Sequence, residues 1–225
     1  MYVKLIALTQ SMLPGTTGLE HSPEAIIEYA GRVCYRSESD HQKLQTTARF
    51  IQRRILEGHE SIIEHASATF EVSGISRAAS HQLVRHRIAS YSQESQRYVD
   101  MSDPEWVVPD EIAANPEAIA VWEESLEQVK AAYRRLRDLE VKKEDARFLL
   151  PNATATRIIV TMNFRELLHV FRLRISPHAQ WEIRALCVQM LEQLVPYAPN
   201  VFGPLKTELE KAHPDFFTPS RPAKA

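Results

Sequence analysis

The chain of 225 residues contains only six glycines, and each of them stands alone in the sequence. They are Gly15, Gly18, Gly31, Gly58, Gly74 and Gly203. Neither G-x-G-x-x-G nor G-x-x-x-x-G-K-[ST] can be formed from them, so the two common glycine loops that bind nucleotide phosphates are absent. This disfavours a Rossmann or P-loop fold.

The composition is that of a globular protein with unevenly placed charges. Hydrophobic residues make up 44% and charged residues 25%, which disfavours disorder and gives enough chain to bury a core. The formal net charge is −2, yet arginines outnumber lysines by 19 to 8 and gather at 77–97 and 157–184. Since Arg binds phosphate or carboxylate in a bidentate manner, local anion sites fit better than a nucleic-acid track, which needs a basic excess.

Cysteine usage and hydropathy indicate the compartment. Cys34 and Cys187 lack C-x-x-C spacing and lie in helical, mostly apolar segments, so both are expected to be small core residues. The N-terminal MYVKLIAL is short, is interrupted by Lys4 and is followed by no cleavage site. No apolar run approaches the roughly 18 residues of a membrane span. We expect a soluble, cytoplasmic protein without a membrane partner.

Capping signals and periodicity predict an α/β (α+β) fold, with one helix-rich domain around an antiparallel or mixed sheet. Ser22-Pro23 and Asn115-Pro116 are N-caps followed by Pro at the first helical position, and Ser76 is a further N-cap. Expected strands cover Met1–Leu8, Ala66–Ser73 and Ala155–Met162. Expected helices cover 23–35, 40–58, 77–87, 116–136, 142–150, 163–175 and 178–194. Asp40 is the expected cap of the second of these helices, and the helix over 116–136 carries an apolar stripe. Ile88–Asp100 is expected to be a loop. Residues 1–212 are expected to form a single domain, and the polar tail 213–225 to fray.

The densest polar segment extends from Arg85 to Arg97. It begins Arg85-His86-Arg87, continues through three serines and ends at Arg97. A solvated helix end followed by a polar loop explains this composition as well as an anion site does. A serine nucleophile is disfavoured because the chain has no G-x-S-x-G elbow, so Ser90 and Ser95 are better suited to hydrogen-bonding a ligand.

Two further segments carry clustered polar side chains. In His59-Glu60-Ser61-Ile62-Ile63-Glu64-His65, the spacing of six places the two histidines on different helix faces, so we expect no metal site. His59 and Glu64 can instead hydrogen-bond a polar heterocycle or serve as structural residues. After Met162, the residues Arg165, His169 and Arg172 share one helix face, and Arg174 and His178 flank a Ser-Pro break.

The segment from Arg85 to Arg97 matches R-H-R-x-x-S-x-x-x-x-S-x-R at all six fixed positions. This motif resembles the signature of the flavin-dependent thymidylate synthases (the ThyX family). The likeness extends through GHESIIEHASATFEVSGISR, LPNATATRI and MNFRELLHVFRLRISPHAQWEIR, and covers about residues 25–202. The chain departs from the family at three places. Many members carry Asn-Glu where this chain has Ser92-Gln93, some carry Asn where it has His169, and some carry Ser where it has Cys34.

The resemblance implies a ThyX-like fold and the conversion of dUMP to dTMP. 5,10-Methylenetetrahydrofolate would supply the carbon, and FAD reduced by NADPH would supply the hydride, without a cysteine nucleophile and without a metal. It also implies a homotetramer whose active sites are shared between subunits. A nucleotide-binding regulator without turnover and an RNA-binding module remain alternatives; the latter requires affinity that falls steeply with salt.

The resemblance also assigns site residues. Contacts to dUMP are implied for Gln82, Arg85, Gln93, Glu94, Ser95, Gln96, Arg97, Arg147 and Arg174, of which Arg85, Arg97 and Arg147 suit the phosphate. Arg174 is the implied catalytic residue, because a fixed cation at the uracil favours the enolate-like form of the ring. Contacts to FAD are implied for His59, Ser61, Glu64, Arg85, His86, Arg87, Ile88, Gln93, Asn163, Arg165 and His169, and His178 is placed by the folate or flavin ring.

Overall fold

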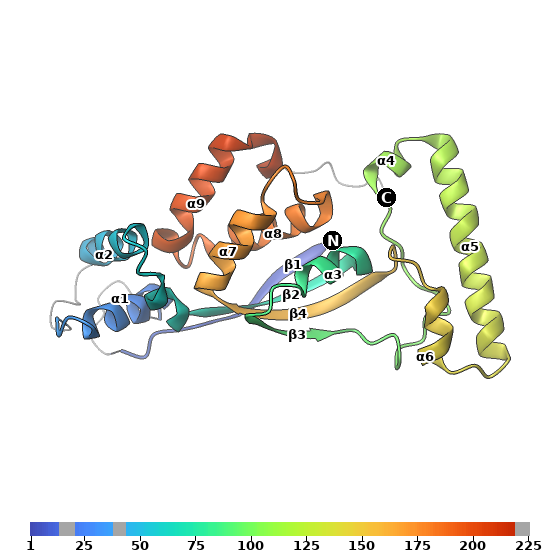
Figure 1. The fold of residues 1–225 in the computed structure, drawn as a ribbon, viewed down its shortest axis with the longest axis horizontal. Helices are drawn as coiled ribbons and strands as arrows, with labels where there is room; N and C mark the ends of the chain where they lie inside the picture. Colours follow the sequence, from blue (N-terminus) through green and yellow to red (C-terminus); the bar gives the residue numbers. More distant parts are fainter. Residues whose placement is uncertain (14–20, 38–43, 219–225) are drawn as a thin grey trace. The chain divides into compact units, whose positions relative to one another are not determined.

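A four-stranded antiparallel sheet with helices confirms the predicted fold class. The computed structural model describes residues 1–13, 21–37 and 44–218 (Figure 1). The strands are β1 (Tyr2–Leu8), β2 (Ser67–Ser76), β3 (Ala89–Gln93) and β4 (Ala155–Asn163), in the order β1-β2-β4-β3. This is not the parallel sheet of a Rossmann fold.

The chain divides into two compact units, which are described separately. The first unit contains Met1–Tyr2, Val72–Arg85 and Ser92–Ile159, and the second contains Val3–Glu71, His86–Tyr91 and the residues from Val160 onward. Each of the four strands contributes residues to both units.

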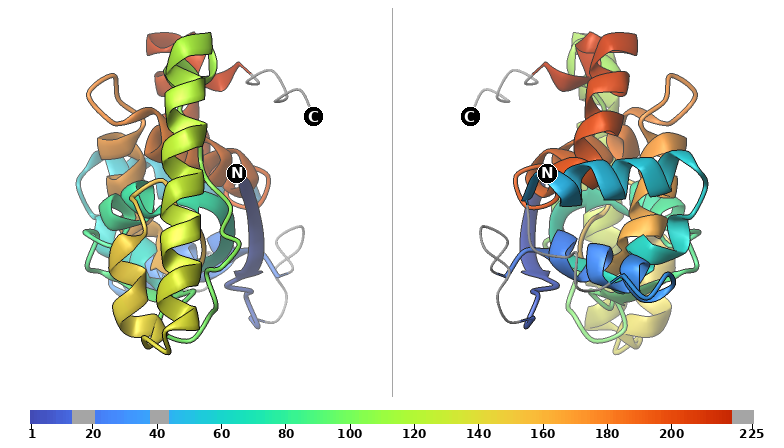
Figure 2. Two further views of the ribbon diagram at one scale, coloured as in Figure 1. Left: turned by 90° about the vertical axis from the view of Figure 1, so that its right-hand side faces the viewer. Right: turned by 90° about the vertical axis from the view of Figure 1, so that its left-hand side faces the viewer.

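The first unit is built around one long helix. It contains α3 (Arg77–Leu83), α4 (Asp110–Ala113), α5 (Pro116–Asp138), α6 (Lys143–Ala146) and the 3-10 helix η3 (Arg147–Leu149). The side chain of Asn115 accepts hydrogen bonds from the backbone N–H groups of the first turn of α5, as the sequence predicts. Leu126 and Tyr133 of the predicted stripe are buried. Tyr133 packs with Met101 and with Ala146 of α6, which lies beside the C-terminal part of α5 (Figures 1 and 2).

The second unit holds most of the buried apolar side chains. It contains α1 (Pro23–Val33), α2 (Leu44–Leu56), η2 (Glu60–His65), α7 (Phe164–Arg174), α8 (Trp181–Leu194), α9 (Pro199–Ala212) and η4 (Pro214–Phe217). Ser22 caps α1 and Gly58, with φ of 77°, follows α2, both as predicted. Asp40, the predicted cap of α2, lies outside the described residues. Helices α2 and α9 lie side by side (Figures 1 and 2). Phe202 of α9 forms edge-to-face contacts with Phe164 and Phe171 of α7.

A buried carboxylate from α1 caps α9, a helix that the sequence analysis does not predict. Helix α9 has no side-chain cap of its own at Ala198. Glu24, 2% exposed, accepts hydrogen bonds from Asn200 N (2.7 Å), Asn200 Nδ2 (2.6 Å) and Val201 N (3.2 Å). Burial raises the pKa of the Glu24 carboxyl, and these hydrogen bonds act in the opposite direction. The carboxylate lies at the positive end of the helix dipole, where negative charge is stabilising.

Several predicted boundaries are wrong for identifiable reasons. The prediction that Ile88–Asp100 is a loop is wrong, because Ala89–Gln93 forms strand β3 beside β4. Helix α3 begins after Ser76 as predicted but ends at Leu83 rather than Arg87. The helix predicted over 142–150 is two short segments, α6 and η3. Helix α8 begins at Trp181 rather than His178, because Gln180 accepts hydrogen bonds from the N–H groups of Glu182 and Ile183.

Two local predictions near the surface are also wrong. Cys34 is exposed at the C-cap of α1 rather than in the core, whereas Cys187 is buried as predicted. The tail from His213 does not fray throughout, because η4 packs through its aromatic residues: Arg184 lies 4.3 Å from the Phe216 ring centroid. Residues 219–225 lie outside the described part. Among the described helices, none has the length and apolar character needed to cross a membrane.

Candidate functional site

The Arg85–Arg97 segment is mostly exposed or half-buried, and only His86 and Gln96 are buried in it. In the first unit, Arg85 is exposed just after α3. In the second unit, His86 is 5% exposed, whereas Arg87 is exposed and Ile88 is 67% exposed. The motif therefore offers cations to solvent but retains its histidine inside the protein.

His86 lies in a buried polar cluster of the second unit. Arg174 Nε donates a hydrogen bond to His86 Nε2 at 3.0 Å, and Glu166 Oε1 lies 3.7 Å from His86 Nδ1. Tyr91 Oη donates to the backbone carbonyl of His86 at 2.8 Å, and the His169 ring stands edge-on with its centroid 6.1 Å away. Burial, followed by the charges of Arg174 and His169, lowers the pKa of His86 to about 4, so the imidazole is neutral at physiological pH.

Helix α7 presents the predicted polar face. Arg165, His169 and Arg172 are all exposed on it. Arg165 forms an ion pair with Glu64 at 2.5 Å, and Glu60 lies 3.6 Å from Arg165 and 3.3 Å from Arg172. The hydrogen bond and charge of Glu64 raise the pKa of Arg165. The structure therefore brings the predicted Glu64 and Arg165 together.

The other predicted flavin-binding residues of the second unit lie on the same elements. His59 is the N-cap residue of η2, and both His59 and Ser61 are exposed. Asn163 has a structural role as the N-cap of α7, since its side-chain oxygen accepts a hydrogen bond from Glu166 N at 2.8 Å. His178 is exposed in the turn before α8, where its N–H donates to Ser176 Oγ at 3.3 Å.

In the first unit, the end of β3 is fixed by hydrogen bonds to neighbouring elements. Gln93 Nε2 donates to Ser80 Oγ at 2.9 Å and to Thr156 Oγ1 at 3.2 Å. A glutamate at this position could only accept from these hydroxyls, so the amide changes the direction of both hydrogen bonds. Glu94 N donates to Arg157 O at 2.9 Å. Gln96 is buried, and Gln82 on α3 is half-buried.

Two predicted phosphate-binding arginines converge on one acidic residue of the first unit. Arg97 Nε donates to Glu144 Oε2 at 2.9 Å, and Arg147 Nε donates to the backbone carbonyl of the same residue at 3.1 Å. Ser95 Oγ accepts from Arg97 N at 3.3 Å, which closes the turn that carries this arginine. Burial and the charge of Arg147 lower the pKa of Arg77, so a third guanidinium lies within electrostatic range of Arg147.

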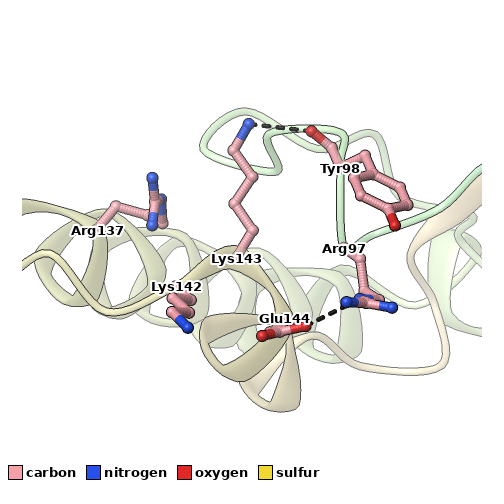
Figure 3. Close-up of a pocket in the computed structure, with 6 residues that line it drawn as sticks. All are labelled: Arg97, Tyr98, Arg137, Lys142, Lys143 and Glu144. Carbon is pink, nitrogen blue, oxygen red and sulfur yellow. Dashed lines mark hydrogen bonds and ion pairs between the residues drawn. The ribbon is translucent and has the colours of Figure 1, made fainter.

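Arg97 also lines a basic pocket of about 330 Å³ (Figure 3). Its walls are formed by Arg97, Tyr98, Arg137, Lys142, Lys143 and Glu144. Lys143 Nζ donates to Tyr98 O at 3.0 Å, which ties α6 to the segment after β3. Four of the six lining residues are cationic, so the pocket favours an anionic group.

Sequence reasoning misses three carboxylates that position the predicted residues. They are Glu60, Glu144 and Glu166, which contact Arg172, Arg97 and His86 respectively. No local signal marks them, because each contacts a residue between 47 and 112 positions away in the chain. Across the described ranges, no group of three or more His, Cys, Asp or Glu side chains is arranged to hold a metal ion.

Comparison with known proteins shows which family has a similar sequence. A family model described as "Thymidylate synthase complementing protein" matches residues 17–200. The chain is 50% identical over 193 residues to the flavin-dependent thymidylate synthase of Geobacter sulfurreducens, covering 82% of this chain and 83% of that protein. The chain belongs to the flavin-dependent thymidylate synthase family.

Another relative and a crystal structure from the same family are also similar to this chain. The chain is 42% identical over 213 residues to the enzyme of Nitratidesulfovibrio vulgaris, covering 86% of this chain and 87% of that protein. The crystal structure of ThyX from Helicobacter pylori, complexed with FAD and dUMP, is similar with a TM-score of 0.71 at 26% identity. That similarity covers 90% of this chain and 98% of the other, so the shared fold is that of a ThyX enzyme.

Proposed function

We propose that this protein makes dTMP from dUMP with bound FAD. The observation that carries the proposal is the complete set of six fixed motif residues from Arg85 to Arg97, in a chain that belongs to this family. The similar Helicobacter pylori protein was crystallised with both FAD and dUMP, which supports the same pair of ligands here.

For dUMP, the phosphate is assigned to Arg85, Arg97 and Arg147. Arg97 and Arg147 both contact Glu144, and Arg97 lines the basic pocket. Binding of a phosphate dianion there replaces the exposed Arg97–Glu144 ion pair, which contributes little by itself. Further contacts to dUMP are assigned to Gln82, which lies before the motif, and to four residues in its second half, namely Gln93, Glu94, Ser95 and Gln96.

Arg174 is assigned to the uracil ring as the catalytic residue. A guanidinium beside the ring carbonyl stabilises the enolate-like form that develops when C5 acts as a nucleophile. Arg174 is half-buried and its Nε is hydrogen-bonded to His86, so its orientation is fixed before substrate binds. The Arg174 guanidinium is therefore already oriented in the protein without substrate.

The second unit carries a donor set that fits a dinucleotide cofactor. Arg165 and Arg87 are exposed cations suited to phosphate, and His59 and His169 are exposed rings suited to a ribose or adenine edge. Ser61, Glu64, Arg85, His86, Ile88, Gln93 and Asn163 complete the assignment. FAD in its reduced form supplies a hydride; the residues named here bind and orient the cofactor.

Two co-substrates complete the proposed reaction. 5,10-Methylenetetrahydrofolate supplies the carbon and NADPH reduces the flavin, with exposed His178 beside the folate or flavin ring. No enzyme cysteine attacks the uracil in this scheme. Burial raises the pKa of the Cys187 thiol to about 12, which leaves it a poor nucleophile, and Cys34 lies at the exposed end of α1. The chemistry needs no metal.

The proposed assembly is a homotetramer in the cytoplasm. Residues 1–212 are proposed to act as one catalytic domain, with active sites that receive residues from more than one subunit. Nucleic acid and membranes are not proposed as partners, because the net charge of −2 offers no basic excess.

The visible spectrum of the purified protein tests the proposal. We expect flavin absorbance, or uptake of added FAD, and a change of the flavin bands when dUMP is added. NADPH oxidation is expected to accelerate with dUMP. A protein that neither contains nor binds flavin contradicts the proposal. A protein that binds flavin and dUMP but shows no dUMP-dependent NADPH oxidation is instead a nucleotide-binding regulator.

A further inference from the structure

The hydrogen bond between Arg174 and His86 determines where the imidazole carries its proton. Arg174 Nε–H can only donate, so His86 Nε2 must present a lone pair at the observed 3.0 Å. The single proton of the neutral ring is therefore on Nδ1. In the other tautomer, two N–H groups would face each other and this hydrogen bond would be lost.

Glu166 faces the protonated side of the ring. Its Oε1 lies 3.7 Å from His86 Nδ1, beyond a direct hydrogen bond but within strong electrostatic range in a buried setting. Both residues are buried, at 8% exposure for Glu166 and 5% for His86. A carboxylate on this side favours the tautomer that carries its proton on Nδ1.

The backbone positions of Glu166, His86 and Arg174 are fixed by other contacts. Glu166 lies in the first turn of α7, where its N–H donates to the cap residue Asn163 at 2.8 Å. Arg174 is the last residue of the same helix. The backbone of His86 is fixed by the Tyr91 hydroxyl, which donates to its carbonyl at 2.8 Å.

We propose that Glu166 is a positioning residue that, through the tautomer of His86, fixes the plane of the Arg174 guanidinium. Because Nε is part of the planar guanidinium, a hydrogen bond at Nε fixes rotation about the Cδ–Nε bond and hence the direction of the terminal amino groups. The inference rests on the proposed function, since it matters for catalysis only if Arg174 acts on the uracil.

The test combines steady-state kinetics of variants with a direct measurement of the His86 tautomer. We expect Glu166→Gln to lower kcat for dTMP formation by about 10- to 100-fold, because small displacements of a catalytic group have effects of this size. The KM for dUMP is expected to change less than threefold, since the phosphate contacts are untouched, and FAD content is expected to equal that of the wild type. Glu166→Asp retains the charge and is expected to recover part of the lost kcat.

The matched control is Glu24→Gln, which neutralises another buried carboxylate in the first turn of a helix of the same unit. Glu24 contacts Asn200 and Val201 rather than His86, so this variant is expected to lose stability and retain kcat. A kcat as low in Glu24→Gln as in Glu166→Gln overturns the inference.

Histidine ring ¹⁵N spectra of the wild type provide a readout that does not depend on activity or on how the variants fold. The His86 resonances are expected to show an unprotonated Nε2 and a protonated Nδ1. A wild-type His86 protonated on Nε2 overturns the inference, and so does a kcat for Glu166→Gln within twofold of the wild type. If the wild type forms no dTMP, the proposed function fails instead, while the spectra still decide the tautomer.

Discussion

His86 makes the folded protein sensitive to acid, in an amount that the structure allows to be worked out. Burial lowers its pKa to about 4 in the folded state, whereas an unfolded histidine titrates near 6.5. Between these two values the unfolded chain binds one proton more than the folded chain. The contribution of His86 to stability is therefore complete above pH 6.5 and is lost as the pH falls toward 4. The difference between the two pKa values corresponds to about 3 kcal/mol.

Comparison of the wild type with His86→Gln isolates this contribution. Urea denaturation of the FAD-free proteins at one concentration, from pH 7.5 to pH 4.5, gives the free energy of unfolding of each. Titratable groups distant from His86 behave alike in both proteins and cancel in the difference. We expect the wild type to lose about 2 kcal/mol relative to the variant over this range. A difference that stays constant with pH would refute the reasoning that His86 is neutral and buried.

Four further predictions follow from the site and its scaffold. Arg174→Ala is expected to abolish dTMP formation while FAD remains bound, as measured by product analysis and flavin absorbance; simultaneous loss of FAD contradicts the assignment. Arg97→Ala is expected to raise the KM for dUMP by about tenfold, since a charge-assisted contact contributes about 1.5 kcal/mol or more, and unchanged steady-state kinetics contradict its phosphate role. Cys34→Ser and Cys187→Ala are each expected to retain turnover, and loss of turnover in either folded variant contradicts a mechanism without a cysteine nucleophile. Glu24→Ala is expected to lower the free energy of unfolding by about 3 kcal/mol in urea denaturation, because buried N–H groups of α9 lose their acceptor; a change below about 0.5 kcal/mol contradicts that capping role.

Local signals predict the parts of the fold that depend on neighbouring residues. Ser22, Ser76 and Asn115 cap helices at the positions expected from the sequence, because an N-cap is completed within three residues of chain. The apolar stripe of α5 is likewise a property of its own periodicity.

Elements that depend on distant partners could not be predicted. Strand β3 has a serine-rich sequence typical of a loop and becomes a strand because β4 lies beside it. Helix α9 begins with Pro199, a local start signal, but its side-chain cap is Glu24, 176 positions away in the chain. Both cases are decided by tertiary contacts that a local pattern does not contain.

The candidate site shows the same division between motif and context. The motif identifies the exposed arginines, because a cation that binds a ligand needs only the right residue type at the right spacing. The carboxylates Glu60, Glu144 and Glu166 could not be identified from the sequence, since their importance comes from the atoms that the fold places beside them.

Product formation tests the central claim most directly. The purified protein is incubated with FAD, NADPH, dUMP and 5,10-methylenetetrahydrofolate labelled in the methylene carbon, and the nucleotides are analysed by mass spectrometry. The proposed function predicts dTMP whose methyl carbon carries the label, and none when dUMP or the folate is omitted. Full occupancy by FAD and dUMP without labelled dTMP contradicts it.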